Sequence, residues 1–386
     1  MKKTALLLIP ALVLCCSCGI PTEEGSAVNT EVKEESEQVI AENIPIHEDQ
    51  VFFYTVAEIN GEDLEKLGFS LGDSINLSFS NGKTFTDVPY HNGYYVKVGG
   101  LVAVAYPGIP GISIAYNLGN GTFKEFELSE DDMVTITLHE KGKYLKEQEL
   151  FSQTHSDDPN EFPSIEVFCN FRPLEGGKLK KNLIYRSASM TNNSTNRASY
   201  VDDLLEKYGI RTVVDLSDTE ETLGEYRAKE DWNSDYFDKL NKNGDVLIVG
   251  LNVNPASESF RKQLSETIYE MVHREGPYLI NCTEGKDRTG YAASLLEALA
   301  GSTYEEIRTD YLKTYEYFYN ITEENSPESV QAAIDASFDP IMEIMFCTEE
   351  GDDIHTLDYA EKARVFCRNA GLTDTQIDEI VEAITE

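Results

Sequence analysis

The sequence predicts a small all-β domain followed by an α/β domain, in which helices flank a mainly parallel central sheet. Between residues 51 and 150, short runs of alternating apolar residues are separated by turn pairs such as Asn81-Gly82 and Asn120-Gly121, a spacing typical of a β-barrel or β-sandwich. From Cys169 onward, strand patterns alternate with helix patterns, as in sheets with crossover helices. After Gly290 only helical patterns follow, and they predict a C-terminal helical cap.

Residues 1–17 have the pattern of a lipoprotein signal peptide. Lys2 and Lys3 precede an apolar run from Ala5 to Leu14 that is too short to span a bilayer. The cysteine cluster that follows resembles the lipobox of bacterial lipoproteins, in which a cysteine becomes the lipidated first residue of the mature chain. Cys18 is the predicted lipidation site, Cys16 is the alternative, and an ordinary secretory leader is the other interpretation. We expect an extracytoplasmic protein, anchored by lipid to a bacterial membrane.

Residues 18–50 are acidic and contain few large apolar side chains, so they predict a disordered tether. The formal net charge of the whole chain is −37, and it becomes −39 without the two lysines of residues 1–17. Such a surface argues against nucleic acid as a partner. An anionic ligand would have to be bound by local cations, and every arginine lies at or after Arg172.

Residues 51–150 form the predicted β domain. The stretch from Val88 to Asn120 resembles the C-terminal β-barrel of SAM-dependent halogenases and hydrolases, which implies a fold but no activity. Its tyrosines are expected to pack in the core or in turns rather than to form a ligand platform: Tyr90, Tyr94, Tyr95 and Tyr106.

Residues 151–163 are polar and contain two prolines, which predicts a linker in which His155 is solvated. The four cysteines beyond the leader are too few for a disulfide framework, and buried free thiols are favoured over a Cys347–Cys367 bridge. Cys169 is expected to be a buried thiol, with a redox partnership with Cys282 as the alternative.

The stretch from Tyr278 to Gly290, YLINCTEGKDRTG, places Cys282 at the end of a predicted strand and Arg288 at the start of a predicted helix. A loop that enters a helix N-terminus directs backbone N–H groups and the helix dipole toward a bound anion. The same field favours the thiolate form of Cys282, and Arg288 can grip two phosphate oxygens. The predicted phosphate-binding residues are Thr283, Glu284, Gly285, Lys286 and Gly290.

Four stretches together resemble the bacterial tyrosine-protein phosphatase family with a lipid-phosphatase-like loop: NCTEGKDRTG, CNFRPLEGG, LIYRSASM and GIRTVVDLSDTEE. The resemblance implies a tyrosine phosphatase fold for residues 164–386 and hydrolysis of phosphomonoesters through a phosphocysteine, without metal or cofactor. The expected partner is a phosphorylated protein or a small phosphorylated substrate. Cys282 matches the nucleophile, Arg288 the phosphate clamp, and Thr289 the hydroxyl that stabilises the departing thiolate. Lys286 and Asp287 match a loop form that is associated with phosphoinositide or broad specificity.

The general acid must be sought elsewhere than in this superfamily's usual loop, because residues 252–257, NVNPAS, contain no carboxylate. Asp287 adjoins the clamp and is the predicted proton donor, with a structural role toward loop amides as the alternative. Asp215 and Asp218 are reserve candidates. For Asp215 the preferred role is an acceptor that fixes Arg288 or Arg172.

Three departures from the family pattern bear on activity. Asn281 stands where the family has a histidine that supports the thiolate, and Pro173 and Ser217 replace an aspartate and an arginine. The leading prediction is a protein tyrosine phosphatase of broad specificity. The alternatives are an inositol-polyphosphate or phosphoinositide phosphatase, and a catalytically weak phosphate-binding lipoprotein.

Overall fold

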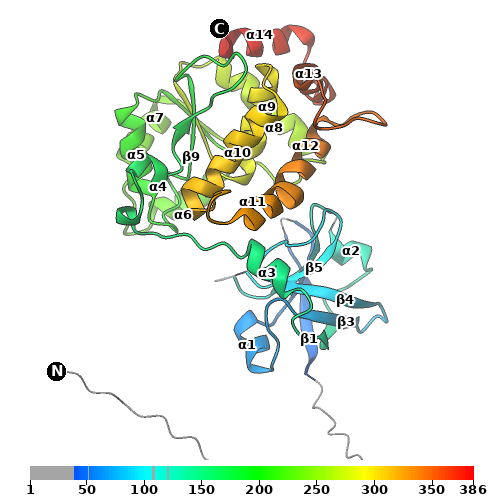
Figure 1. The fold of residues 1–386 in the computed structure, drawn as a ribbon. Helices are drawn as coiled ribbons and strands as arrows, with labels where there is room; N and C mark the ends of the chain where they lie inside the picture. Colours follow the sequence, from blue (N-terminus) through cyan, green and yellow to red (C-terminus); the bar gives the residue numbers. More distant parts are fainter. Residues whose placement is uncertain (1–38, 51, 107–108, 120) are drawn as a thin grey trace, which may run out of the picture. The chain divides into compact units, whose positions relative to one another are not determined.

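The structure is a computed structural model that describes residues 39–50, 52–106, 109–119 and 121–386 (Figure 1). Val39 to Glu386 forms one compact unit. The signal peptide, Cys18 and most of the predicted tether therefore lie outside the described residues. No helix in the described ranges combines the length and the hydropathy needed to cross a bilayer.

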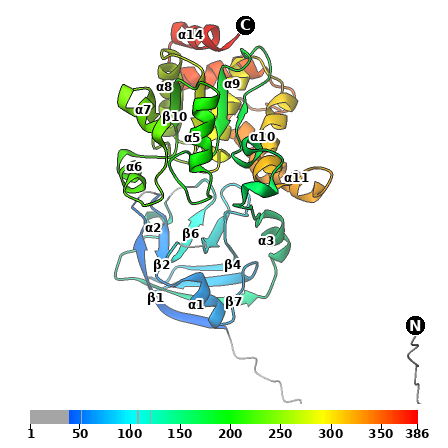
Figure 2. The same ribbon diagram turned by 90° about the vertical axis from the view of Figure 1, so that its left-hand side faces the viewer.

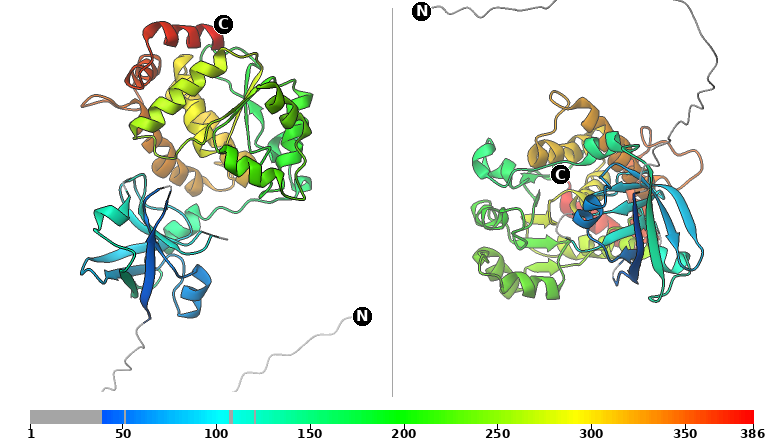
Figure 3. Two further views of the ribbon diagram at one scale, coloured as in Figure 1. Left: turned by 180° about the vertical axis from the view of Figure 1, so that it is seen from behind. Right: turned by 90° about the horizontal axis from the view of Figure 1, so that it is seen from below.

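The first domain is a closed barrel, drawn in blue and cyan in Figure 3. Its strands close in the order β1-β2-β6-β5-β4-β3-β7, and all neighbours are antiparallel except β4 and β5. The strands are β1 (Ile40–Glu48), β2 (Thr55–Ala57), β3 (Ser74–Phe79), β4 (Thr84–His91), β5 (Leu101–Val104), β6 (Ile112–Tyr116) and β7 (Met133–Glu140). The helices are α1 (Gly61–Lys66), α2 (Thr122–Glu125) and α3 (Leu145–Phe151).

Strand β1 corrects the predicted boundary between tether and barrel. Ala41, Ile44 and Ile46 are buried in the barrel core, although the sequence analysis assigns them to the disordered tether. The strand was hidden because its polar residues, such as Glu42, occupy the outward positions and a bulge between Ala41 and Ile44 breaks the alternation. The barrel thus begins about ten residues earlier than its composition indicates.

The tyrosines of the barrel pack against other side chains. Tyr90 lies in the barrel core. The rings of Tyr94 and Tyr106 meet edge to face at 6.0 Å, and Tyr95 stacks on Phe151 of α3 at 5.5 Å. Their apolar contacts are those expected of aromatic residues in strands and turns.

The second domain contains a five-stranded sheet in the order β11-β10-β12-β9-β8. The first four strands are parallel and β8 is antiparallel. The strands are β8 (Arg172–Pro173), β9 (Ile184–Ser187), β10 (Thr212–Asp215), β11 (Val246–Ile248) and β12 (Tyr278–Asn281). The helices that precede or join them are η1 (Pro159–Glu161), α4 (Ile165–Phe168), α5 (Ala198–Lys207), α6 (Glu220–Arg227), α7 (Asp235–Asn243) and α8 (Glu258–Val272).

Both faces of this sheet are buried, which explains why its strands read as continuous apolar runs. Successive residues point to opposite faces, so Leu279 joins the core with α5 and α7, whereas Ile280 joins the core with α8. Val213 and Val214 divide in the same way. Figure 2 shows α5 and α7 beside β10.

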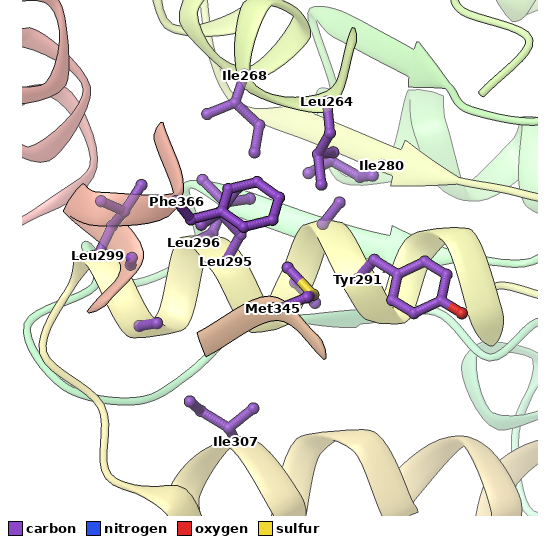
Figure 4. Close-up of a cluster of buried hydrophobic side chains, with 14 of the residues drawn as sticks. Leu264, Ile268, Ile280, Tyr291, Leu295, Leu296, Leu299, Ile307, Met345 and Phe366 are labelled. Atoms are coloured by element: carbon purple, nitrogen blue, oxygen red, sulfur yellow. The ribbon is translucent and has the colours of Figure 1, made fainter. Parts of the chain in front are cut away.

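After β12 the described chain contains helices and connecting loops without a further strand, namely α9 (Asp287–Leu299), α10 (Tyr304–Tyr319), α11 (Pro327–Ala333), η2 (Ile334–Phe338), α12 (Asp339–Phe346), α13 (Tyr359–Asn369) and α14 (Asp374–Ile384). Helix α9 is buried from Thr289 to Leu299 and lies in the centre of this core (Figure 4). Its neighbours include Leu264, Ile268, Ile280, Ile307, Met345 and Phe366. A helix buried on all sides holds the preceding loop in a fixed position.

Two details of this region differ from the sequence-based expectations or decide between alternatives. The sequence also offers Ser302 and Glu305 as the capping pair of helix α10, but the structure places the cap one residue later, at Thr303 and Glu306, where Glu306 accepts a hydrogen bond from the N–H of Thr303. All four described cysteines are free, so the Cys347–Cys367 bridge is absent.

Candidate active site

The loop that contains Cys282 lies at the carboxyl ends of the parallel strands. It begins after β12 at Cys282 and ends where α9 begins at Asp287. In the sheet register, Asn281 has Asp215 of β10 on one side and Ser187 of β9 on the other. The thiol is buried. This is the edge at which ligands bind in open α/β sheets.

The carbonyl groups of the loop point outward, where they accept hydrogen bonds from the surrounding scaffold. Three successive carbonyl groups accept such bonds: Thr283 from Ser189 N at 3.1 Å, Glu284 from Asn170 Nδ2 at 3.0 Å and Gly285 from Arg186 Nη2 at 2.6 Å. Because a peptide unit is planar and trans, the N–H that follows each carbonyl points the opposite way, into the loop. Over the described ranges, the backbone N–H groups from Thr283 to Thr289 have no hydrogen-bond acceptor.

This arrangement requires glycine at position 285. Its φ is +71°, a left-handed conformation that side chains disfavour. A Cβ atom there would lie 2.3 Å from the carbonyl oxygen of Ser187. The loop therefore passes β9 too closely for any side chain.

A buried ionic network supports the loop from behind. Asp310 of α10 pairs with Arg172 Nε at 2.9 Å and with Arg186 Nη1 at 2.5 Å. Burial alone would raise the pKa of the Asp310 carboxyl, but the two arginines outweigh it and lower that pKa to about 2. Arg172 also bonds the side chain of Asn170, so both side chains that hold the loop carbonyls are anchored to Asp310.

Sequence reasoning included Arg172 as possible support but missed Asp310, Arg186 and Asn170 as parts of the site. A signal was present in α10. Asp310 falls in the same helical phase as Ile307 and Thr314, which are buried. An aspartate on the apolar face of a helix indicates a buried cation, because burying an unpaired carboxylate costs free energy.

Arg288 lies on the first turn of α9, and its Nη1 donates to the carbonyl oxygen of Ser217 at 3.3 Å. Asp215 contacts neither Arg288 nor Arg172 by hydrogen bond, so the expected direct bridge is wrong. Instead, Asp215 Oδ1 accepts from the N–H groups of Ser217 and Asp218 at 2.9 and 3.1 Å. Asp215 thus shapes the turn whose carbonyl orients Arg288.

Asp215 is fully buried, and its Oδ2 has no partner among the described residues. Burial and the nearby Asp218 raise the pKa of the Asp215 carboxyl to about 7. Asp218 in turn accepts a 2.6 Å hydrogen bond from Thr191, which also contacts Ser189. These two reserve acids are therefore tied into the scaffold of the site.

Two further buried polar groups lack partners within the described ranges. Both side-chain polar atoms of Asn281 are unpaired, at the position where the family has histidine. The hydroxyl of Thr289 is also buried and unpaired. Burying such groups costs free energy, and a bound group that pairs with them recovers that cost.

Asp287 is exposed at the N-terminus of α9. Among the described residues no hydrogen bond or ion pair is formed by its carboxylate. A structural role toward loop amides would require such a bond. The carboxylate is instead open to solvent beside the loop.

Lys286 is held to one side of the loop. Its Nζ lies 3.4 Å from Glu284 Oε2 and 3.2 Å from the hydroxyl of Tyr319, which itself donates to Glu284 at 2.5 Å. The sequence predicts a solvated His155, whereas the structure shows it half-buried. Its ring packs 4.8 Å from the ring of Phe318 and 6.2 Å from that of Tyr319, and its Nε2 lies 3.2 Å from Asp157 Oδ1. The polar linker thus contributes a side chain behind the loop.

Cys169 is buried among aromatic side chains in the core with α4. Burial raises the pKa of its thiol. Such a thiol is poorly suited to redox exchange, because the thiolate is the reactive form.

Comparison with known proteins identifies the second domain. The model of the tyrosine phosphatase family matches residues 164–386, more than half of the chain. No curated protein matches the chain. One solved structure that does match is the core catalytic domain of the PP-IP phosphatase SIW14 from S. cerevisiae in complex with citrate, at 20% identity. That match covers 45% of this chain and 90% of the other, with a TM-score of 0.27, too low to support an argument.

The family match coincides with the domain that contains the cysteine loop, the five-stranded sheet and the buried arginine network. The chain therefore belongs to the tyrosine phosphatase family and is a cysteine-dependent phosphatase.

Proposed function

We propose that this protein is a protein tyrosine phosphatase of broad specificity in which Cys282 is the nucleophile. One observation carries the proposal: within the described ranges, the N–H groups from Thr283 to Thr289 are unpaired in the loop that directly follows Cys282, with Arg288 at the loop's end. Such a concavity is complementary to a tetrahedral phosphate dianion. The family match supports the same reaction.

In the first step, the Cys282 thiolate attacks phosphorus and the ester bond breaks on the opposite side. The loop N–H groups and Arg288 stabilise the charge on the three equatorial oxygens. Asp287 is the group that transfers a proton to the leaving oxygen, since its carboxyl lies at the end of the loop and forms no hydrogen bond or ion pair with the described residues. The products are an alcohol or phenol and phosphocysteine.

In the second step, water attacks the phosphocysteine and the thiolate leaves. Asp287 accepts a proton from that water, by the reverse of its first role. The unpaired hydroxyl of Thr289 supports a role as hydrogen-bond donor to the departing thiolate. Inorganic phosphate then leaves the loop and the enzyme is regenerated.

The alternative of a phosphate-binding lipoprotein without turnover is less well supported. A binder has no need of a thiol at the base of the loop, and the chain retains Cys282 together with Thr289 and Asp287. Asn281 in place of histidine reduces the support for the thiolate, so we expect a slower enzyme rather than an inactive one.

An inositol-polyphosphate or phosphoinositide phosphatase is the second candidate. It is favoured by Lys286, which places an ammonium group on the phosphate-binding loop itself. A free ammonium at that position would bind a second phosphate group of the substrate.

We also propose that the enzyme works outside the cytoplasm, tethered to a membrane through lipid on Cys18. The leader pattern of residues 1–17 and the acidic stretch after it support this location. Metabolic labelling with a palmitate analogue tests it, because Cys18→Ala abolishes labelling if Cys18 is the acceptor. Unchanged labelling in that variant would move the anchor to another cysteine.

Phosphate release by residues 39–386 tests the activity. The substrates are a phosphotyrosine peptide, phosphatidylinositol-phosphate vesicles and inositol hexakisphosphate, and Cys282→Ser is the control. We expect release from the peptide that disappears in the control. No release above the control on any substrate would leave only phosphate binding.

A further inference from the structure

Glu284, Lys286 and Tyr319 form a closed triangle of polar contacts at the side of the phosphate-binding loop. Glu284 Oε2 contacts both Lys286 Nζ and the Tyr319 hydroxyl, and these two groups contact each other. The ammonium also lies 5.2 Å from the centroid of the Tyr319 ring. Lys286 and Glu284 are only 21% and 30% exposed, so solvent competes weakly for either charge.

The contacts of this triangle reduce the positive charge that Lys286 presents to a ligand. Burial alone would lower the pKa of Lys286, but Asp287, Tyr319 and Glu284 outweigh it and hold that pKa well above its usual range. The ammonium is therefore charged throughout the working range, yet its charge is already compensated. Of the cations on the loop, Arg288 has no carboxylate partner among the described residues.

We propose that Glu284 is a specificity residue, which pairs with Lys286 and so restricts the loop to substrates that carry a single phosphate group, such as phosphotyrosine. This inference rests on the proposed function and names its substrate class. A substrate with several phosphates needs a second cation beside the loop. Here it meets a compensated lysine, an additional carboxylate and a chain of strongly negative net charge.

The geometry explains why Glu284 can act on Lys286 without occupying the phosphate position. The backbone of Glu284 belongs to the loop, with its carbonyl held from outside by Asn170. Its side chain reaches instead to Tyr319, at the C-terminal end of α10. The side chain therefore modulates charge, while the backbone binds phosphate.

The test compares the wild-type protein with Glu284→Gln, Lys286→Met and the double variant. Glutamine keeps the size of glutamate and can still bond to Tyr319, but it removes the carboxylate that contacts Lys286. The measured quantity is the ratio of kcat/KM for inositol hexakisphosphate to kcat/KM for a phosphotyrosine peptide. We expect Glu284→Gln to raise this ratio about tenfold, and the double variant to return it to the value of Lys286→Met.

The inference is overturned if Glu284→Gln leaves the ratio unchanged. It is also overturned if the double variant keeps the raised ratio, because the gain would then not depend on Lys286. Each variant is its own folding control, because the ratio compares two substrates in one preparation.

Failure of the proposed function is recognised separately. In a Cys282→Ser background, calorimetry gives the Kd of inositol hexakisphosphate and of the phosphotyrosine peptide without turnover. If the wild-type protein hydrolyses neither substrate, the proposed function fails. Tighter binding of inositol hexakisphosphate by about tenfold in Cys282→Ser/Glu284→Gln would still support the role of Glu284. If inositol hexakisphosphate binds Cys282→Ser and Cys282→Ser/Glu284→Gln with the same Kd, the proposed role of Glu284 is contradicted.

Discussion

Arg186 donates a 2.6 Å hydrogen bond to the carbonyl oxygen of Gly285, so a buried guanidinium on β9 holds the phosphate-binding loop from its outer side. The same guanidinium pairs with Asp310. A charge on the scaffold thus fixes the direction in which the peptide groups of the loop point. Preorganised N–H groups lower the barrier because they need not reorient during the reaction.

Removing the charge of Asp310 should damage both stability and catalysis. Asp310→Asn removes the carboxylate that pairs with both buried arginines, and breaking such a pair costs about 3 kcal/mol or more. We expect a lower urea midpoint and a fall in kcat larger than any rise in KM, because the loop loses its alignment. Glu305→Gln is the matched control, since Glu305 is an exposed acid on the same helix. Equal stability of the two variants would refute a supporting role for Asp310.

Gly285→Ala should abolish anion binding without unfolding the protein. The new Cβ would collide with the carbonyl of Ser187, and the loop would have to move away from β9. Gly209→Ala provides the control, because Gly209 also has a positive φ but has no neighbour within 4 Å of a Cβ. Inhibition by orthovanadate measures the loop directly. Vanadate inhibition retained in the Gly285 variant would show that the close approach to β9 is dispensable.

Asp287→Asn tests the proton donor through the leaving group. An activated aryl phosphate leaves without much help, whereas an alkyl phosphate needs protonation. We expect kcat to fall by about 100-fold for alkyl phosphates and by much less for aryl ones. Equal losses on both substrates would exclude Asp287 as the acid and return attention to Asp218.

Asp215 should make stability depend on pH. Its folded-state pKa of about 7 lies above the value of about 4 for an exposed aspartate. The folded state therefore binds the extra proton, and the contribution of Asp215 is fully present below pH 4 and lost as pH rises through 7. Asp215→Asn removes this dependence.

Between pH 5 and pH 8 we expect the free energy of unfolding of the wild-type protein to fall by about 2 kcal/mol more than that of Asp215→Asn. Urea denaturation at both pH values measures the difference. Parallel changes in the two proteins would show that Asp215 is already ionised in the folded state at pH 5, contrary to a raised pKa.

The parts of the site that follow from local pattern were predictable from the sequence. Cys282 and Arg288 lie in one continuous strand-loop-helix stretch, whose apolar run and helix start are visible without tertiary information. The parallel sheet also follows from alternating strand and helix patterns. The role of Asp287 stays a prediction, based on the absence of a carboxylate from residues 252–257.

What could not be predicted depends on contacts between distant segments. Asp310 lies 124 positions from Arg186, and the sequence does not show which buried cation an aspartate will meet. His155 was expected in solvent because its neighbours in the sequence are polar, but its ring also packs against Phe318 and Tyr319 of α10. Strand β1 was assigned to the tether because acidic composition outweighed a short pattern of buried Ala41, Ile44 and Ile46.

The most direct test of the account is to trap the covalent intermediate. Residues 39–386 are mixed with a phosphotyrosine peptide, quenched in acid within milliseconds, digested and analysed by mass spectrometry. The account predicts a phosphate group on Cys282 that accumulates in Thr289→Ala, where breakdown is slowed, and is absent in Cys282→Ser. Two results would contradict the account. One is phosphate release by the wild-type protein without any phosphate on Cys282, and the other is unimpaired phosphate release by Cys282→Ser.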